Sequence, residues 1–411
     1  MAKKIERNII TSLDIGTSKV VALVGEITAE GTVEIIGIGR YPSRGLKRGV
    51  VVDIEATVNS IQRAVQEAEL MSGCEVRSVY TGIAGSHIRS LNSHGIVAIK
   101  DKEVAQIDID RVLDAAKAVA IPADQKILHV LPQEFIIDHQ GNIREPVGMS
   151  GVRLEAKVHI VTGAASAAQN IDKCVRRCGL DVREVILEQL ASSHAVLADD
   201  EKDLGVCLVD IGGGTTDIAI YYDGAIQYTG VIPIAGDQVT NDLAMALRTP
   251  TKAAEAIKLG DGYALFDMAN SNHMIDVLSV NDRAARKVSA KVVAEIVSAR
   301  YEELFYLIRQ EIKRSGCEDR IVSGIVLTGG ASKVRGGLEL AEQCFDMPVR
   351  MGCALQTSGL DEAKTNPSLA TSVGLLLQGI QQQFEGGYNA PSSHQRASVW
   401  NQMKKWFNGN F

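Results

Sequence analysis

The sequence predicts an α/β protein of two similar lobes, with a small inserted α+β subdomain and an amphipathic helix at its C-terminal end. One motif occurs twice: a strand ends in an Asp–Gly turn and is followed by two further strands, with the aspartates at positions 14 and 210. Segments with helical periodicity separate and follow the two copies. Two similar halves that face each other would leave a cleft between them.

The first copy of the motif lies near the N-terminus. An apolar run over residues 9–13 leads into the loop DIGTSK at 14–19, and residues 20–27 and 33–38 have strand character. The loop offers a carboxylate, a glycine turn, two hydroxyls and an amine, from Asp14, Gly16, Thr17, Ser18 and Lys19. Such a loop alone is typical of many turns between strands, but its pairing with the second copy favours a phosphate site.

The second copy repeats this order, with an apolar run over residues 206–209, the loop DIGGGTTD at 210–217, and strands over 218–222 and 225–231. Three successive glycines, Gly212, Gly213 and Gly214, let the backbone turn sharply and bring its N–H groups close to an anion. Hydroxyl donors follow at Thr215 and Thr216. The flanking Asp210 and Asp217 would repel phosphate, so a hydrated Mg²⁺ between them is the natural mediator. The alternative is a plain glycine hairpin.

A third loop follows the apolar strand over residues 325–327. It reads Thr328-Gly329-Gly330-Ala331-Ser332-Lys333. Glycines at a strand end allow a base or sugar to approach the backbone closely, and Lys333 could lie over a ring face. Taken alone, this loop is equally compatible with a simple turn.

Helical periodicity predicts an amphipathic helix over residues 54–71 that ends near Gly73, and a long helix over 283–312. The stretch 84–162 mixes strand-like runs with one helical run at 109–119. This stretch interrupts the first half and is predicted to form the inserted α+β subdomain.

The composition is that of a soluble globular protein. Of 411 residues, 45% are hydrophobic and 23% charged, whereas aromatic residues make up only 4%. The scarcity of aromatic residues argues against a carbohydrate-binding or base-stacking surface. The net charge of −7 argues against a broad electrostatic grip on nucleic acid.

Other classes of site lack their sequence signatures. The chain has no G-x-x-x-x-G-K-[ST], H-E-x-x-H or G-x-S-x-G string, and its seven cysteines include no C-x-x-C pair. Reduced thiols are therefore expected. The N-terminal residues lack the apolar run of a secretory signal, and no apolar stretch is long enough to span a bilayer. We therefore expect a cytoplasmic protein.

The C-terminal segment 396–411 reads RASVWNQMKKWFNGNF and follows a polar stretch at 381–395 that is typical of a flexible linker. On a helix, its apolar side chains fall within an arc of about 120°; they are Val399, Trp400, Met403, Trp406 and Phe407. With Arg396, Lys404 and Lys405 and no acidic residue, this segment is suited to an anionic membrane surface. The alternative is a helix that docks on the protein itself or on a partner.

The three loops in this order resemble the actin/Hsp70/sugar-kinase superfamily of ATP-binding proteins, which has a duplicated ribonuclease H-like fold. The whole chain is similar to the FtsA family of bacterial cell-division proteins within it. The strings that carry this resemblance are SLDIGTSKVVALVGE, GLKRGVVVDI, ILEQLASSHAVL, LVDIGGGTTDIAI and VLTGGAS.

The resemblance implies roles for particular residues. Asp14 and Asp210 would order the water shell of Mg²⁺, and the glycine and hydroxyl residues of the first two loops, with Gly236, would contact the nucleotide. Glu188 would position a hydrolytic water, although it could also be a surface residue that opens a helix. Glu255 and Lys258 would hold the ribose hydroxyls, or form an ordinary i,i+3 ion pair.

The resemblance also implies a function. Such a protein binds ATP and Mg²⁺, polymerises on the cytoplasmic face of the inner membrane, tethers FtsZ filaments at the septum and recruits later division proteins. It is an assembly protein rather than an enzyme, with slow hydrolysis allowed. Because one short basic helix binds lipid weakly, attachment should depend on several tails acting together.

The expected domains follow from these motifs. They are a first lobe at 1–83 and 163–203, the insert at 84–162, a second lobe at 204–236 and 312–380 with its outer subdomain at 237–311, a linker at 381–395 and the terminal helix at 396–411. Three rival functions stay open at this point: a small-molecule kinase, an Hsp70-like chaperone and a pilus-assembly adaptor. A kinase has no use for a membrane-binding tail, and a chaperone of this kind would need a substrate-binding domain after the nucleotide lobes. The adaptor would account for the loops but not for the tail.

Overall fold

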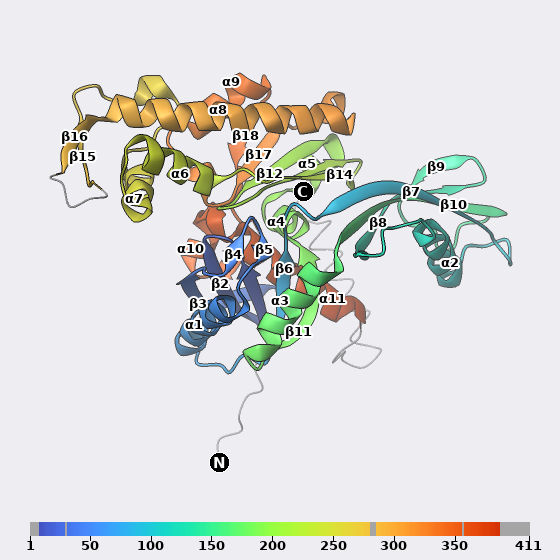
Figure 1. Ribbon diagram of the computed structural model, residues 1–411. Helices are drawn as coiled ribbons and strands as arrows, with labels where there is room; N and C mark the ends of the chain where they lie inside the picture. The colour runs from blue at the N-terminus through green and yellow to red at the C-terminus, as the bar shows by residue number, and fades with distance from the viewer. Residues whose placement is uncertain (1–7, 29–30, 280–284, 356, 387–411) are drawn as a thin grey trace, which may run out of the picture.

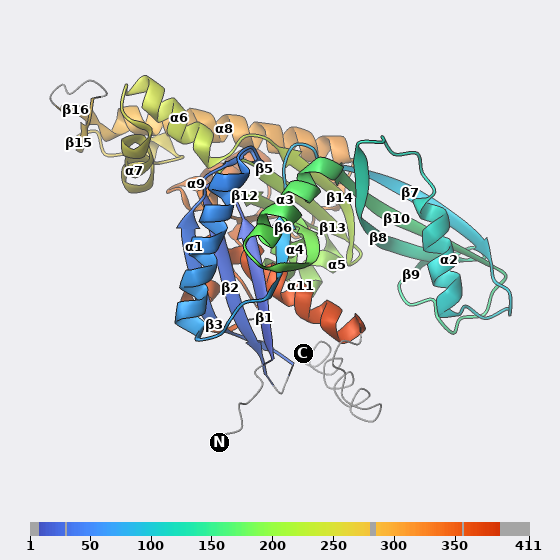
Figure 2. The same cartoon turned by 60° about the horizontal axis from the view of Figure 1, so that its bottom comes forward.

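The computed structural model describes residues 8–28, 31–279, 285–355 and 357–386 of the chain. Two lobes, each built on a central sheet, lie one above the other in Figure 1. The inserted subdomain projects to one side, and the outer part of the second lobe lies at the opposite end (Figures 1 and 2). The predicted tail helix at 396–411 lies outside the described residues.

The first lobe surrounds a sheet with strand order β11-β6-β1-β2-β3-β19. Its strands are β1 (Ile9–Ile15), β2 (Lys19–Ile27), β3 (Val33–Pro42), β6 (Ser78–Ile83), β11 (Asp181–Leu187) and β19 (Ser358–Gly359). Helices α1 (Ile54–Ser72), α3 (Ala165–Arg177), α4 (Glu188–Val196), α10 (Asp361–Thr365) and α11 (Ala370–Gly386) accompany it, with the hairpin of β4 (Leu46–Lys47) and β5 (Val50–Val51). Strands β1, β2 and β3 confirm the three strands predicted for the first copy of the motif.

The second lobe repeats this plan around a sheet with strand order β14-β13-β12-β17-β18. Its strands are β12 (Val206–Ile211), β13 (Thr216–Tyr222), β14 (Ala225–Ile232), β17 (Ile325–Thr328) and β18 (Val349–Met351). Helices α5 (Asp199–Leu204), α6 (Gly236–Ala246), α7 (Thr251–Asp261), α8 (Ala290–Ser315) and α9 (Gly337–Phe345) and the hairpin of β15 (Met274–Val277) and β16 (Arg286–Ser289) complete it. The antiparallel β12–β13–β14 unit confirms the second copy of the motif.

The inserted subdomain has its own sheet, with strand order β7-β10-β8-β9. Its elements are β7 (Arg89–Ala98), α2 (Gln106–Lys117), β8 (Gln125–Ile137), β9 (Gln140–Ile143) and β10 (Arg153–Ala164). Helix α2 packs closely on one face of this sheet, because Gly95 has no side chain and a Cβ there would lie 2.2 Å from the carbonyl oxygen of Val112. A separate apolar core that includes Val112, Leu154 and Val158 lies between the helix and the sheet.

Two helices illustrate how the sequence sets their ends. The carboxylate of Asp53 accepts a hydrogen bond from Ala56 N–H at the start of α1, and Gly73, at φ 68°, ends it, as predicted. Helix α8 begins later than expected, at Ala290 rather than residue 283, with Ser289 as its N-cap. The predicted start was wrong because residues 286–289 pair with β15 as a strand instead.

The predicted domain borders need two corrections near the C-terminus. Residues 357–380, expected in the second lobe, return to the first: β19 pairs with β3, and Val373, Leu376 and Ile380 join the first lobe's core. In addition, α11 extends to Gly386, so the predicted linker at 381–395 is helical over its first six positions. Glutamine is a good helix former, and residues 381–383 simply continue the helix.

The thiols of all seven cysteines are free. Among the helices of the described residues, none combines the length and the apolar character needed to cross a membrane.

Candidate functional site

A cavity of about 550 Å³ lies between the two lobes, within the size range of small-molecule sites. Both lobes and all three predicted loops line it. The predicted site residues at its surface are Asp14, Gly16, Thr17, Ser18, Lys19, Glu188, Asp210, Gly212, Gly213, Gly214, Thr215, Asp217, Gly236, Glu255, Lys258, Gly329, Gly330, Ala331 and Lys333. The structure therefore brings together residues that are spread over most of the chain.

Two predicted residues do not line this cavity. The hydroxyl of Thr216 donates to the carbonyl oxygen of Ile234 over 2.8 Å, and that of Ser332 donates to Gly329 over 2.7 Å. Both side chains are buried. They hold the loops in shape and do not face a ligand.

The first two loops meet face to face across the cleft. A Cβ at Gly213 would lie 2.8 Å from the Cβ of Ser18, and a Cβ at Gly214 would lie 2.7 Å from the hydroxyl oxygen of Thr17. These distances leave no room for a side chain, so glycine is needed at both positions. The close approach brings the backbones of both loops to the edge of one space, as an anion site built from two loops requires.

Asp14 and Asp210 lie at the ends of the equivalent strands β1 and β12 and are both nearly buried. Asp14 Oδ2 accepts a hydrogen bond from Ser372 over 3.1 Å. Asp210 Oδ2 accepts hydrogen bonds from the hydroxyls of Ser192, over 2.5 Å, and Thr371, over 3.2 Å. The pKa of Asp14 is raised to about 6, mainly by burial; Lys19 opposes this shift and Asp210 adds to it.

Asp217 adds a third carboxylate. Its Oδ2 accepts a hydrogen bond from Thr215 over 3.0 Å, while its buried Oδ1 has no hydrogen-bond partner among the described residues. Burial, with repulsion from Asp210, raises the pKa of Asp217 to about 8. A charged carboxylate that is buried without a partner is unfavourable, so this oxygen is suited to a nearby cation.

Glu188 is the first residue of α4 and lines the cleft. Its side chain lies over Gly82, where a Cβ would come within 2.8 Å of Glu188 Cγ. Burial raises the pKa of Glu188 well above its ordinary value, and repulsion from Asp14, Asp217 and Asp210 adds to the shift. Four acidic groups thus surround one space.

No three Asp, Glu, His or Cys side chains of the described ranges converge closely enough to ligate a metal directly. The carboxylates therefore fit a cation that keeps its water shell, which Mg²⁺ does readily. The unpaired Oδ1 of Asp217 and the raised pKa values of the surrounding carboxylates both fit an ion of this kind.

The second lobe supplies a polar cluster at the other end of the cleft. Lys258 Nζ donates to Gly236 O over 3.1 Å and to the Thr240 hydroxyl over 2.9 Å, and it pairs with Glu255 over 2.7 Å. The Thr240 hydroxyl also donates to Glu255. The i,i+3 pair is therefore part of a wider network that faces the cavity.

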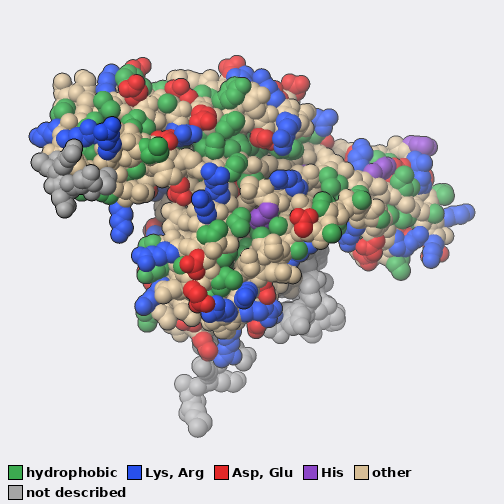
Figure 3. Space-filling model, viewed as in Figure 1, with side chains coloured by type: hydrophobic (Ala, Val, Ile, Leu, Met, Phe, Trp, Pro, Cys, Tyr) green, Lys and Arg blue, Asp and Glu red, His purple; other side chains and the backbone are tan. Residues whose placement is uncertain are grey.

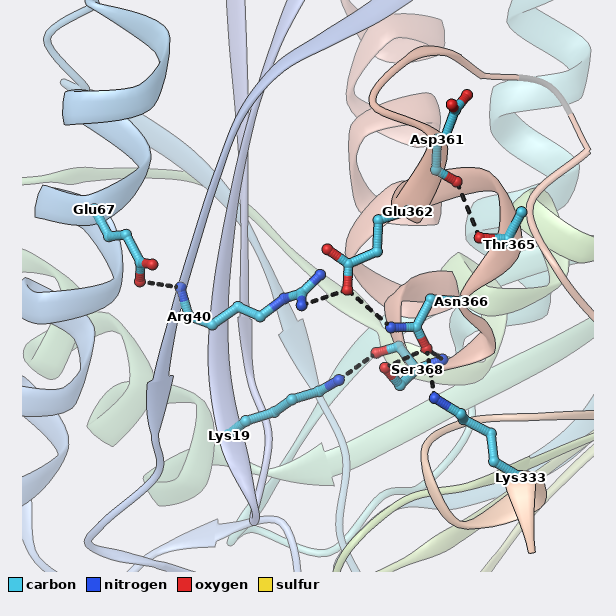
Figure 4. Close-up of polar contacts among 9 residues, drawn as sticks. All are labelled: Lys19, Arg40, Glu67, Lys333, Asp361, Glu362, Thr365, Asn366 and Ser368. Carbon is cyan, nitrogen blue, oxygen red and sulfur yellow. Dashed lines mark hydrogen bonds and ion pairs between the residues drawn. The ribbon is translucent and has the colours of Figure 1, made fainter. Parts of the chain in front are cut away.

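Two lysines from different lobes contact one short segment beside α10. Lys19 Nζ donates to Ser368 O over 2.8 Å, and Lys333 lies 3.5 Å from the side-chain oxygen of Asn366 (Figure 4). Arg40 pairs with Glu362 in the same group over 2.5 Å. Lys333, for which a place over a ring face was expected, lines the cavity beside Asn366.

Three residues that hold the aspartates were not found from the sequence: Ser192, Thr371 and Ser372. Ser192 had a local signal, because it follows Glu188 by four positions on the same helix and so lies on the same face. Thr371 and Ser372 had none, since they lie 161 and 358 positions along the chain from the aspartates that they contact.

On the face seen in Figure 3, Lys and Arg side chains are interspersed with Asp and Glu side chains. That face therefore presents no broad basic surface of the kind that nucleic acid requires.

Solved structures share this fold. The PilM–PilN type IV pilus biogenesis complex contains a chain with a TM-score of 0.66 and 16% identity, covering 90% of this chain and 98% of that one. MreB 5 of Spiroplasma citri bound to AMPPNP has a TM-score of 0.56 and 15% identity, covering 93% and 100%. At these identities the likeness establishes an actin-like fold and nothing more.

Sequence relatives are much closer. The family model for "Cell division protein FtsA" matches residues 207–374, and that for "SHS2 domain inserted in FTSA" matches 85–162. The cell division protein FtsA of Pseudomonas aeruginosa is 60% identical over the full length of both chains. Those of Neisseria meningitidis and Escherichia coli K12 are 49% and 44% identical over 99% and 94% of both chains. The chain, with its actin-like fold and SHS2 insert, therefore belongs to the FtsA family of bacterial cell-division proteins.

Proposed function

We propose that this protein binds Mg²⁺–ATP between its lobes and, in that state, polymerises on the cytoplasmic face of the inner membrane at the division septum. There it tethers FtsZ filaments and recruits later division proteins. The nucleotide half of the proposal is carried by one observation: glycine loops of both lobes approach each other beside four carboxylates that repel one another.

The residues present have the chemistry that Mg²⁺–ATP needs. Loop N–H groups and the hydroxyls of Thr17, Ser18 and Thr215 would contact the phosphates, and Asp14, Asp210 and Asp217 would accept hydrogen bonds from water on the metal. Bound Mg²⁺ would supply positive charge to the phosphates and relieve the repulsion among the carboxylates. Glu255 and Lys258 would contact the ribose.

Ligand binding at such a site would stabilise the closed arrangement of the lobes. A ligand shifts a conformational equilibrium only through contacts that it makes better in one state. Because the phosphate loops come from different lobes, an anion held by both would favour closure. Glu188 would hold a water near the phosphates, and its raised pKa suits an exchange of protons with that water. The result is an assembly protein with slow turnover.

The membrane half of the proposal rests on the sequence of residues 396–411. Its apolar arc and its three basic residues have the composition of an interfacial helix. A single such helix binds weakly, so polymerisation would strengthen attachment by bringing many tails together. By its FtsA resemblance, the outer subdomain at 237–311 would contact FtsZ, and the insert would serve polymer and partner contacts.

The cleft is tested directly by Asp210→Ala, with Asp200→Ala as the control, because Asp200 is exposed on α5. Titration with a fluorescent ATP analogue and Mg²⁺ should show binding for the wild type and the control and none for Asp210→Ala. Circular dichroism confirms that each variant is folded. Equal affinity in all three proteins would contradict the site.

A further inference from the structure

A buried hydrogen bond joins the inserted subdomain to the strand that leads into the nucleotide cleft. His129, on β8 of the insert, accepts a hydrogen bond at Nε2 from the backbone N–H of Leu187 over 3.0 Å. Leu187 is the last residue of β11 and the residue before Glu188. His129 is 9% exposed and Leu187 is fully buried. Water therefore cannot easily replace this bond.

The protonation state of His129 agrees with its role as a hydrogen-bond acceptor. A ring nitrogen accepts a hydrogen bond only when it carries no proton, so the imidazole must be neutral. Burial lowers the pKa of His129 to about 4, which keeps it neutral near pH 7. The neutral ring then carries its proton on Nδ1.

The bond lies where the chain changes direction. Leu187 is extended, at φ −63° and ψ 127°, and α4 begins directly after it without a side-chain cap. The Glu188 side chain then points over Gly82 into the cleft. The N–H held by His129 is therefore one residue away from the carboxylate that faces the proposed phosphate site.

The insert also contacts the central sheet of the second lobe. Gln133 Nε2 donates to Ile226 O over 3.0 Å, and the Ser90 hydroxyl donates to Thr229 O over 3.1 Å. Both acceptors belong to β14, which pairs with the strand that begins at Thr216. The insert thus spans from the start of α4 in one lobe to the sheet that carries the second phosphate loop.

We infer that His129 is a positioning residue: through its bond to Leu187 N–H, the inserted subdomain fixes the start of α4 and the place of Glu188 in the cleft. The inference rests on the proposed function only in taking Glu188 to act on bound nucleotide. It assigns to the insert a role in the cleft in addition to any contacts with partners.

Two substitutions separate this role from simple packing. His129→Gln places an amide oxygen near the position of Nε2 and keeps an acceptor, whereas His129→Leu fills the space without one. His139→Leu is the matched control, because His139 is exposed in the turn between β8 and β9 of the same subdomain.

The first measurement is hydrogen exchange of the full-length protein without nucleotide. In peptides that cover residues 186–190, His129→Leu should exchange about tenfold faster than the wild type, because the Leu187 amide loses its buried acceptor. His129→Gln and His139→Leu should match the wild type. Equal exchange in His129→Leu and the wild type, or equal acceleration in the Gln and Leu variants, would overturn the inference.

The second measurement is ATP turnover. His129→Leu should lower kcat about tenfold with little change in KM for ATP, because a small displacement of a positioned group affects the reaction more than binding. His129→Gln should restore kcat, and a KM effect alone would contradict a positioning role. If the wild type does not bind Mg²⁺–ATP, the proposed function is refuted. The hydrogen-exchange experiment would still show whether His129 holds the Leu187 amide.

Discussion

Ser372 donates a hydrogen bond to Asp14 across 358 positions of the sequence, and its neighbour Thr371 donates to Asp210 in the other lobe. The first turn of α11 therefore holds both aspartates at once. One helix end fixes the relative position of two equivalent carboxylates that belong to different sheets. We expect this arrangement to set the affinity for Mg²⁺.

Ser372→Ala removes the hydroxyl that stabilises the charged form of Asp14. A hydrogen bond to a charged group contributes about 1.5–3 kcal/mol, so the Kd for Mg²⁺–ATP should rise about tenfold. Isothermal titration calorimetry measures this change. Ser298→Ala serves as the control, because it removes a hydroxyl bond to Glu302 on α8; an equal loss of affinity there would point to a general effect on stability.

Gly214→Ala introduces a Cβ that would lie 2.7 Å from the hydroxyl oxygen of Thr17 and 3.0 Å from Cα of Arg48. The lobes would have to separate to make room, so nucleotide affinity should fall at least about tenfold. Gly260→Ala is the matched control. No atom lies within 4 Å of its added Cβ, and the change should stabilise α7 by about 0.5–1 kcal/mol. Unchanged affinity in Gly214→Ala would show that the loops do not meet as described.

Asp217→Asn tests the repulsion among the carboxylates. The pKa of Asp217 is about 8 in the folded protein and lower in the unfolded chain. Asp217 therefore keeps its proton up to a higher pH in the folded state. The free energy of unfolding therefore decreases as pH rises from about 4 towards 8.

For the wild type without Mg²⁺, this decrease should be about 1–2 kcal/mol larger between pH 6 and 8 than for Asp217→Asn. Chemical denaturation at several pH values measures it. The same variant should bind Mg²⁺–ATP more weakly, since it removes a partner of the metal's waters. Parallel stability profiles for the two proteins would contradict the assignment of a raised pKa to Asp217.

Lys258→Ala should distinguish the ribose end of the cleft from its phosphate end. Lys258 bonds to Gly236 and Thr240 and pairs with Glu255. Its loss should weaken ATP binding about fivefold or more while leaving inorganic triphosphate binding nearly unchanged. Competition against a fluorescent nucleotide compares both ligands. Equal weakening for the two would place Lys258 at the phosphates and not at the ribose.

The sequence allowed prediction of those parts of the site that depend on neighbouring residues. The Asp–Gly loops at 14–18 and 210–217 are each enclosed within one strand–turn–strand unit, so their shape and the position of Asp14 and Asp210 follow from local pattern. The duplication then indicates that the two loops face each other.

What the sequence did not reveal depends on contacts between distant segments. Nothing near Ser372 indicates that α11 crosses back to the first lobe, because its apolar face would suit either core. The contact of His129 with Leu187 likewise depends on how the insert folds back against β11. The start of α8 was misplaced because residues 286–289 pair with β15 as a strand.

A membrane tether controlled by nucleotide is tested most directly by tryptophan fluorescence. The two tryptophans of the chain, Trp400 and Trp406, both lie in the C-terminal segment, so indole emission reports on that segment alone. Emission should be recorded with vesicles rich in anionic lipid, with and without Mg²⁺–ATP. We expect a blue shift that grows with Mg²⁺–ATP and is weaker in Asp210→Ala; no shift under either condition would contradict the membrane tether.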